Sequence, residues 1–162
     1  MKSRQAVRQT NRNSISARFS VRDYPFFFMH TIIHKNNENI GDALKHLGFT
    51  PVIWRVLALL QENDGISISE LSQQSLIERT LLSRLLSDME RRGYVRKEPD
   101  RRDKRYTAVY LQPAGYDAFE KVLPIARRQI ERAVAGLSQR DLDKLQQILR
   151  HITENLNRSP YI

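Results

Sequence analysis

The sequence contains no cysteine, which excludes disulfides, thiolate nucleophiles and thiol-based redox sensing. No apolar run approaches the roughly 18 residues that a membrane-spanning helix needs. The N-terminus has no apolar stretch like that of a secretory signal. The glycine-rich phosphate loop and the nucleophile elbow of hydrolases are also missing. These absences argue against an enzyme and against a membrane-spanning segment, and the lack of cysteine is compatible with a reducing cytoplasm. We expect no cofactor and no membrane partner.

Acidic residues are missing from residues 1–22, which carry six arginines and lysines. Low apolar content and high charge predict a disordered basic arm that can touch nucleic-acid phosphates. Organelle transit peptides have a similar composition, but the amphipathic pattern that they need is poor here. We therefore separate residues 1–22 from the folded part of the chain.

The chain as a whole is strongly basic, with a formal net charge of +9 over 162 residues. Its length suggests one domain with appendages, and a hydrophobic content of 40% is enough for a core. The excess charge favours a polyanionic partner, either nucleic acid or an anionic membrane surface.

Residues 23–49 predict one long helix. Pro25 fits its first turn, and Gly48 is a typical C-terminal stop. A second helix is expected to begin at Pro51 and to end before the turn signal at residues 63–65.

Two helices with a brief connection follow. Ser67 and Glu70 make an S-x-x-E capping box in front of the first. The second lies in ERTLLSRLLSDMERRG, where apolar residues at spacings of three and four share one face. The other face carries Arg79, Thr80, Ser83, Arg84 and Ser87. This arrangement is that of a helix-turn-helix, whose exposed face we expect to contact DNA.

Residues 91–115 concentrate arginine and lysine around two short alternating runs, YVRK and TAVYL. A helix-turn-helix followed by a basic two-stranded hairpin is a winged helix, whose wing can reach phosphates and the minor groove. Arg96, Lys97 and Lys104 are expected to add salt-sensitive, non-specific affinity.

Residues 113–162 predict two further helices. Pro124 lies inside the first and is expected to kink it, and Ser138 with Asp141 caps the second. The second has an apolar repeat typical of a helix–helix dimer, although packing within one monomer is the alternative. The repeat consists of Leu142, Leu145, Leu149, Ile152 and Leu156.

The order of these elements, and above all SRLLSDMERRGYVRKEPDRRDKRYTAVYLQPAG, resembles the MarR family of transcriptional regulators. The resemblance covers about residues 24–157. It implies a mainly α fold with a small β-hairpin wing: a winged helix-turn-helix lobe at 50–112 between dimerisation helices at 23–49 and 113–162. It also implies a homodimer on a pseudo-palindromic DNA operator. Many members repress genes until a small ligand, often an aromatic acid, binds.

The resemblance assigns roles to single residues of the wing loop. Arg102 stands where the family's wing-tip arginine enters the minor groove. Asp100 and Arg105 stand where an acid and an arginine brace the wing, and Arg105 is also counted as a DNA contact. Gln112 departs from the family, which usually has a Thr or Ser cap there.

An effector site is expected in the cleft that the family places between its dimer core and its DNA-reading lobe. Arg55 or a histidine could pair with a carboxylate while aromatic rings bury the apolar body of the ligand. An ordinary core tryptophan and a surface arginine are the alternative. The candidates are His30, His34, Trp54, Arg55, Tyr116 and Phe119.

Three other interpretations stay open beside a homodimeric, ligand-released repressor. His30, His34 and Glu38 repeat every four positions and could hold zinc, although we expect no metal without a denser ligand cluster. An architectural DNA-binding protein would need no effector. A protein–protein module would use the basic surface against an acidic partner, but it would be expected to show aromatic anchors.

Overall fold

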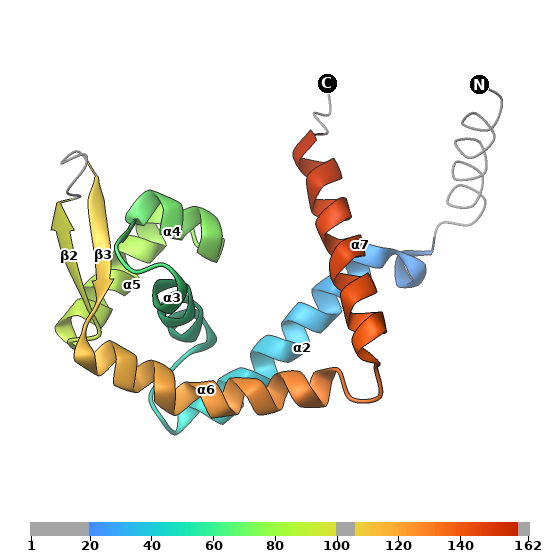
Figure 1. The fold of residues 1–162 in the computed structure, drawn as a ribbon, viewed down its shortest axis with the longest axis horizontal. Coiled ribbons are helices and arrows are strands. Elements are labelled where there is room, and N and C mark those ends of the chain that lie inside the picture. The colour runs from blue at the N-terminus through green and yellow to red at the C-terminus, as the bar shows by residue number, and fades with distance from the viewer. Residues whose placement is uncertain (1–19, 100–105, 159–162) are drawn as a thin grey trace. The chain divides into compact units, whose positions relative to one another are not determined.

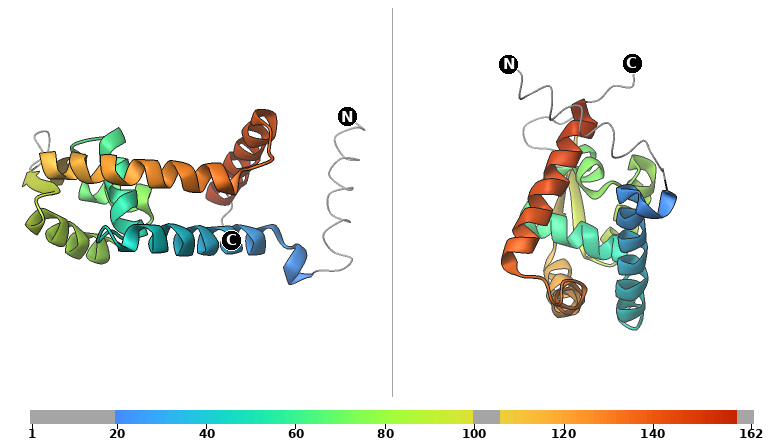
Figure 2. Two further views of the ribbon diagram at one scale, coloured as in Figure 1. Left: turned by 90° about the horizontal axis from the view of Figure 1, so that it is seen from below. Right: turned by 90° about the vertical axis from the view of Figure 1, so that its right-hand side faces the viewer.

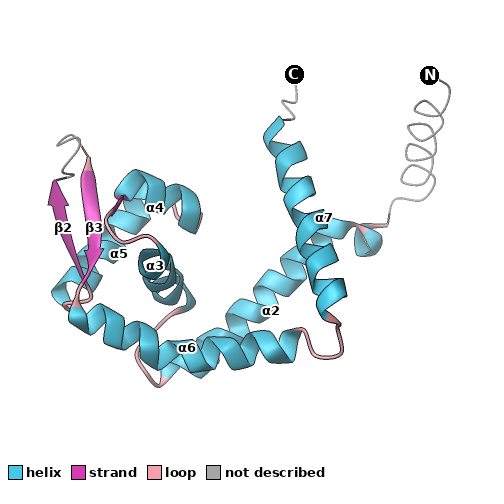
Figure 3. Cartoon of the chain, in the orientation of Figure 1, coloured by secondary structure: helices cyan, strands magenta, loops and turns pink. Residues whose placement is uncertain are grey.

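The computed structural model describes residues 20–99 and 106–158 (Figure 1). The chain divides into two compact units, Met1–Pro51 and Val52–Ile162. Helices dominate the described residues of both units, and the strands described lie in the second (Figure 3). This is the predicted mainly α architecture with a β wing. Within the described ranges no helix combines the length and the apolarity needed to cross a membrane.

The first unit consists of a short 3-10 helix, η1 (Val21–Asp23), and the long helix α2 (Pro25–Lys45). Pro25 is the first residue of α2, as predicted, because its fixed φ suits a position whose N–H has no helical partner. The chain leaves α2 through Gly48, whose φ of +72° favours glycine. Most of the predicted basic arm, residues 1–19, lies outside the described residues.

The second unit begins with three helices and a short strand: α3 (Pro51–Glu62), β1 (Ile66–Ser67), α4 (Ile68–Ser75) and α5 (Arg79–Arg91). The predicted capping box opens α4, because the Ser67 hydroxyl accepts from the Glu70 N–H at 3.1 Å and the Glu70 carboxylate accepts from the Ser67 N–H at 3.0 Å. The core of this lobe is aliphatic, and its fully buried side chains include Val56, Leu57, Leu60, Leu71, Leu82, Leu86, Met89 and Val109.

The sheet has three antiparallel strands in the order β1-β3-β2, with β2 at Val95–Pro99 and β3 at Thr107–Leu111. The two strands of the predicted hairpin pair Val95 with Leu111 and Lys97 with Val109. The third strand, β1, was not predicted. It adds two residues to the free edge of β3, where Ile66 pairs with Val109.

Two long helices complete the chain, α6 (Pro113–Ala133) and α7 (Gln139–Arg158) (Figure 2). α6 runs through Pro124 as one helix, and Gln112 gives it no side-chain cap, since the Gln112 amide donates to the Leu111 carbonyl instead. The Asp141 carboxylate accepts from both the N–H and the hydroxyl of Ser138, which makes the predicted cap of α7. No residue of α7 is buried.

Candidate nucleic-acid interface

Helix α5 presents a polar face to solvent and an apolar face to the lobe. Its buried face consists of Leu82, Leu86 and Met89, all fully covered. Four of the five residues of α5 that are expected to contact DNA are exposed on the other side: Arg79, Thr80, Ser83 and Arg84. These four residues are called the reading face below.

Glu78 caps α5 directly before the reading face. Its carboxylate accepts hydrogen bonds from the Thr80 N–H at 2.8 Å and the Leu81 N–H at 3.0 Å. These two backbone bonds, with a smaller contribution from the charge of Arg84, lower the pKa of Glu78 below its usual value. The sequence pattern began this helix at Glu78, and the structure makes Glu78 its N-cap, a position where glutamate is not among the usual residues.

Ser87 differs from the other residues expected to read DNA, because its hydroxyl already has two protein partners. It donates to the Ser83 carbonyl at 3.0 Å and accepts from the Lys97 ammonium at 3.1 Å. Ser87 is also half-buried. The structure therefore connects Ser87 to the wing.

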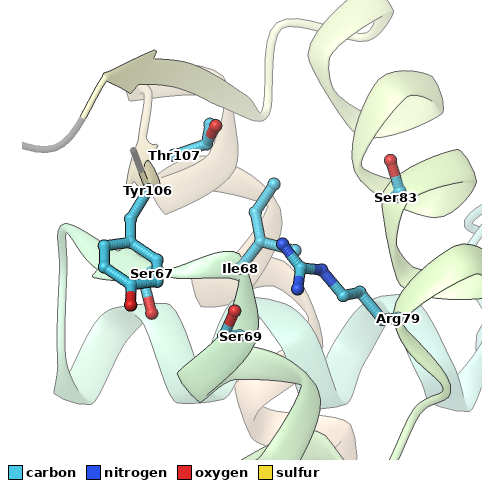
Figure 4. A pocket seen from close by; sticks show the side chains of 7 residues that line it. All are labelled: Ser67, Ile68, Ser69, Arg79, Ser83, Tyr106 and Thr107. Carbon is cyan, nitrogen blue, oxygen red and sulfur yellow. The ribbon is translucent and has the colours of Figure 1, made fainter. Parts of the chain in front are cut away.

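A polar hollow of about 130 Å³ lies beside the reading face (Figure 4). In Figure 4 the Arg79 guanidinium extends from α5 toward Ile68 and Ser69 at the start of α4. Within the described part of the chain, the Arg79 guanidinium and the Ser69 hydroxyl make no hydrogen bond or ion pair. Among the described residues that line the hollow, none carries a carboxylate and Arg79 is the one charged residue. The lining residues are Ser67, Ile68, Ser69, Arg79, Ser83, Tyr106 and Thr107.

In the described part of the wing, the positive charge of Arg96 is paired within the sheet. Arg96 forms an ion pair with Glu98 and lies over the Tyr110 ring, 4.6 Å from the ring centroid. Arg96 is thus tied to the sheet. The wing-loop residues Asp100, Arg102, Lys104 and Arg105 lie outside the residues that the structure describes.

The effector candidates of the second unit contact other parts of that unit. Trp54 stacks on Phe119, with ring centroids 5.3 Å apart. Arg55 donates from Nη1 to the Ser75 carbonyl at 3.0 Å, which joins α3 to the last residue of α4. Tyr116 has 41% of its surface exposed.

The two histidine candidates lie on α2 in the first unit, and both are exposed. His34 Nε2 is 3.2 Å from Glu38 Oε1, and Glu38 also pairs with Lys35 at 2.6 Å. The Lys35 hydrogen bond and charge, followed by the charge of His34, lower the pKa of Glu38. Over residues 20–99 and 106–158, no group of three or more His, Asp or Glu residues is placed to hold a metal ion.

Comparison with protein families and with curated proteins gives one consistent result. The family described as MarR family matches residues 47–105. The chain is 27% identical over 141 residues to the HTH-type transcriptional repressor IacR of Pseudomonas putida, covering 87% of this chain and 84% of that protein. It is 30% identical over 122 residues to the transcriptional repressor MprA of Escherichia coli, covering 74% and 69%.

Solved structures agree with these relatives. A MarR family regulator from Silicibacter pomeroyi superposes with a TM-score of 0.78 at 29% identity, covering 88% of this chain and 96% of that one. A mutant MarR of E. coli in complex with operator DNA has a TM-score of 0.69 at 21% identity, covering 77% and 90%. At 21% identity, the similarity to the DNA complex shows a shared fold only.

Proposed function

Because the chain belongs to the MarR family of transcriptional regulators, we propose that it is a homodimeric repressor that binds one DNA operator and is released by a small ligand. Both curated relatives compared above are named as transcriptional repressors. A repressor acts on the chromosome, and we therefore place the protein in the cytoplasm.

The observation that carries the proposal is the reading face of α5. Two arginines, a serine and a threonine stand exposed on one side of a helix whose other side is fixed in the core. Arginine in the major groove can make a bidentate contact to guanine, and hydroxyls serve bases or phosphates. Arg84 and Thr80 lie farthest from the buried face, and we assign base contacts to them first.

We assign the hollow beside the reading face to one backbone phosphate of the DNA. Its described lining residues supply hydroxyl groups and the Arg79 guanidinium and no carboxylate, which is the chemistry that a phosphodiester needs. Such a contact would set how deeply α5 enters the groove. For the wing loop we retain the proposals that Arg102 and Arg105 contact DNA and that Asp100 with Arg105 braces the loop.

Two exposed apolar surfaces support a homodimer. Leu145, Leu149 and Leu156 on α7 are 45%, 38% and 56% exposed, and Phe28, Ile32 and Ile33 on α2 are 54%, 65% and 59% exposed. Leucines and isoleucines at helical spacing are seldom left in water, and a second copy of the chain can cover them. A dimer also supplies the two reading helices that a pseudo-palindromic operator requires.

For the effector we propose an aromatic carboxylic acid, on the strength of the family resemblance. In the second unit the exposed Tyr116 can offer its hydroxyl to such a ligand, and in the first unit His30 and His34 are exposed candidates. Trp54 and Phe119 contribute ring surface only if their stacked pair opens or offers an edge. Titration of benzoic and phenolic acids, followed by calorimetry and by the fluorescence of Trp54, tests the effector proposal. If no acid gives binding heat or releases the DNA, the proposal is rejected.

The experiment that tests the function is selection of bound fragments from the source genome, followed by anisotropy titration of the selected duplex. We expect one preferred sequence, and Arg84→Ala should weaken its binding about ten-fold or more. Arg102→Ala should do the same and leave the fold and the dimer intact. Equal binding to all duplexes would favour an architectural protein, and binding no tighter than to heparin would reject the proposal.

A further inference from the structure

We propose that Glu90, Ser87 and Lys97 form a brace between α5 and the wing, in which Lys97 positions the reading helix and does not itself contact DNA. These three residues are called the brace below. The inference rests on the proposed DNA-binding function for its meaning, but its geometry is a property of the free protein.

The Glu90 carboxylate binds both the backbone N–H and the side-chain ammonium of Lys97. The Lys97 backbone N–H donates to Glu90 Oε1 at 2.9 Å, and the Lys97 ammonium lies 3.0 Å from Glu90 Oε2. Glu90 is on α5 and Lys97 is on β2. A single side chain therefore fixes both the main chain and the side chain of the strand to the helix.

The brace continues from Lys97 to the reading face. The ammonium also donates to the Ser87 hydroxyl at 3.1 Å, and that hydroxyl donates to the carbonyl of Ser83, one turn earlier. Only 24% of the Lys97 side chain is exposed. Its charge is thus directed into the protein, whereas the Arg79 and Arg84 side chains are exposed.

The position of Lys97 in β2 allows the brace to orient the whole strand. Lys97 is the central residue of β2, with two paired residues on each side of it. Fixing this residue orients the strand that leads into the wing loop. A wing and a reading helix that are held in one relative position can engage DNA together with less loss of conformational freedom on binding.

Removal of Glu90 distinguishes a positioning role from a purely electrostatic one, because the two roles predict opposite changes in DNA affinity. A carboxylate near the DNA surface repels phosphates, so its removal should strengthen binding if electrostatics dominate. Removal of a brace should weaken binding. The hydrogen bonds from Lys97 also lower the pKa of Glu90, in agreement with a carboxylate that stays charged in this contact.

The first test compares Glu90→Ala with Asp88→Ala by anisotropy on the selected operator. Asp88 is an exposed carboxylate on the same helix whose ion-pair partner, Arg91, is also on α5. We expect Glu90→Ala to weaken binding roughly three- to ten-fold and Asp88→Ala to leave it equal or tighter. If Glu90→Ala tightens binding as Asp88→Ala does, the brace is refuted.

The second test measures salt dependence for Lys97→Met and for the Glu90→Ala/Lys97→Met double variant. A positioning role predicts the wild-type slope of log affinity against log salt, and a double variant no weaker than the weaker single one. A lysine that binds a phosphate predicts a slope reduced by about 0.9 and losses that add. A reduced slope with additive losses would show that Lys97 contacts DNA and would refute its positioning role.

The third test needs no DNA and no change to Lys97. Hydrogen exchange at the Lys97 amide should be at least several-fold faster in Glu90→Ala than in Asp88→Ala, because the acceptor of that N–H is gone. Unchanged exchange would disprove the brace. A wild-type chain that binds no duplex would reject the proposed function, while this exchange result would still decide the brace.

Discussion

Trp54 and Phe119 stack with their ring centroids 5.3 Å apart and their planes 17° from parallel. The pair joins α3 to α6 within the second unit. Both rings were expected to line an effector site, and the structure places them against each other. The contact is therefore part of what holds this unit together, whether or not a ligand uses its edge.

Truncation of Phe119 should destabilise the fold and change the environment of Trp54. For Phe119→Ala we expect a loss of about 2 kcal/mol in the free energy of unfolding, since the ring is half-buried and its stacking is lost as well. Trp54 is the only tryptophan, so its emission reports this site alone and should shift to the red. Urea unfolding of Tyr116→Ala is the control, and a change within about 0.5 kcal/mol is expected there. Equal losses in the two variants would contradict a specific role for the stack.

Gly115 should not tolerate a methyl group. A Cβ at this position would overlap the Tyr94 carbonyl oxygen and lie 3.0 Å from Leu111 Cδ2, because the start of α6 passes directly against the start of β2. Gly115→Ala should cost at least about 3 kcal/mol, measured by thermal unfolding. Gly41→Ala is the matched control: its Cβ would meet Pro51 at an ordinary 3.6 Å, and alanine in α2 should stabilise by about 0.5–1 kcal/mol. A similar loss at both positions would refute the close approach.

The parts of the fold that the sequence predicted depend on near neighbours in the chain. The capping box at Ser67 and Glu70 spans three residues, and the apolar stripe of α5 repeats within one helix. Such signals need no knowledge of the rest of the molecule. The left-handed residue that ends α4 is Leu76, with φ of 55°, where glycine or asparagine would have been the usual sign.

The parts that it missed depend on residues far apart in the chain. Strand β1 has two residues, and its partner Val109 lies 43 positions after Ile66. The periodicity of α5 puts Ser87 on the solvent side, but β2 returns to that side and its Lys97 engages Ser87. Helical spacing cannot distinguish a face that meets water or DNA from one that meets a strand of the same chain.

The N-terminal cap of α5 should respond to acid. Since the pKa of Glu78 is lowered on folding from its ordinary 4.5, the cap stabilises the helix above that pH and is lost as the pH falls through the lower, folded value. The amide proton shifts of Thr80 and Leu81 should titrate together, with a midpoint below pH 4.5. Glu78→Gln should abolish that titration, and Arg84→Ala should move the midpoint up. A midpoint at or above 4.5 would contradict a charged cap.

The apolar stripe of α7 provides the test of the homodimer. Leu149 is 38% exposed and lies between Leu145 and Ile152 on one side of the helix. If a second copy covers this side, Leu149→Arg places a charge in an apolar interface and should convert the dimer to a monomer in sedimentation velocity.

The control for Leu149→Arg is Gln147→Arg, which adds the same side chain to the opposite, exposed side of α7. It should remain a dimer and unfold at about the wild-type temperature. Leu149→Arg should keep its helical content, because α7 has no buried residue within its own chain, but it should unfold at a lower temperature that no longer depends on concentration, since dimerisation no longer stabilises it. A monomer cannot place two reading helices on one operator, so Leu149→Arg should also lose most of its preference for the selected duplex over unrelated DNA. An intact Leu149→Arg dimer would place the interface away from this stripe, and a wild-type monomer would reject the homodimer.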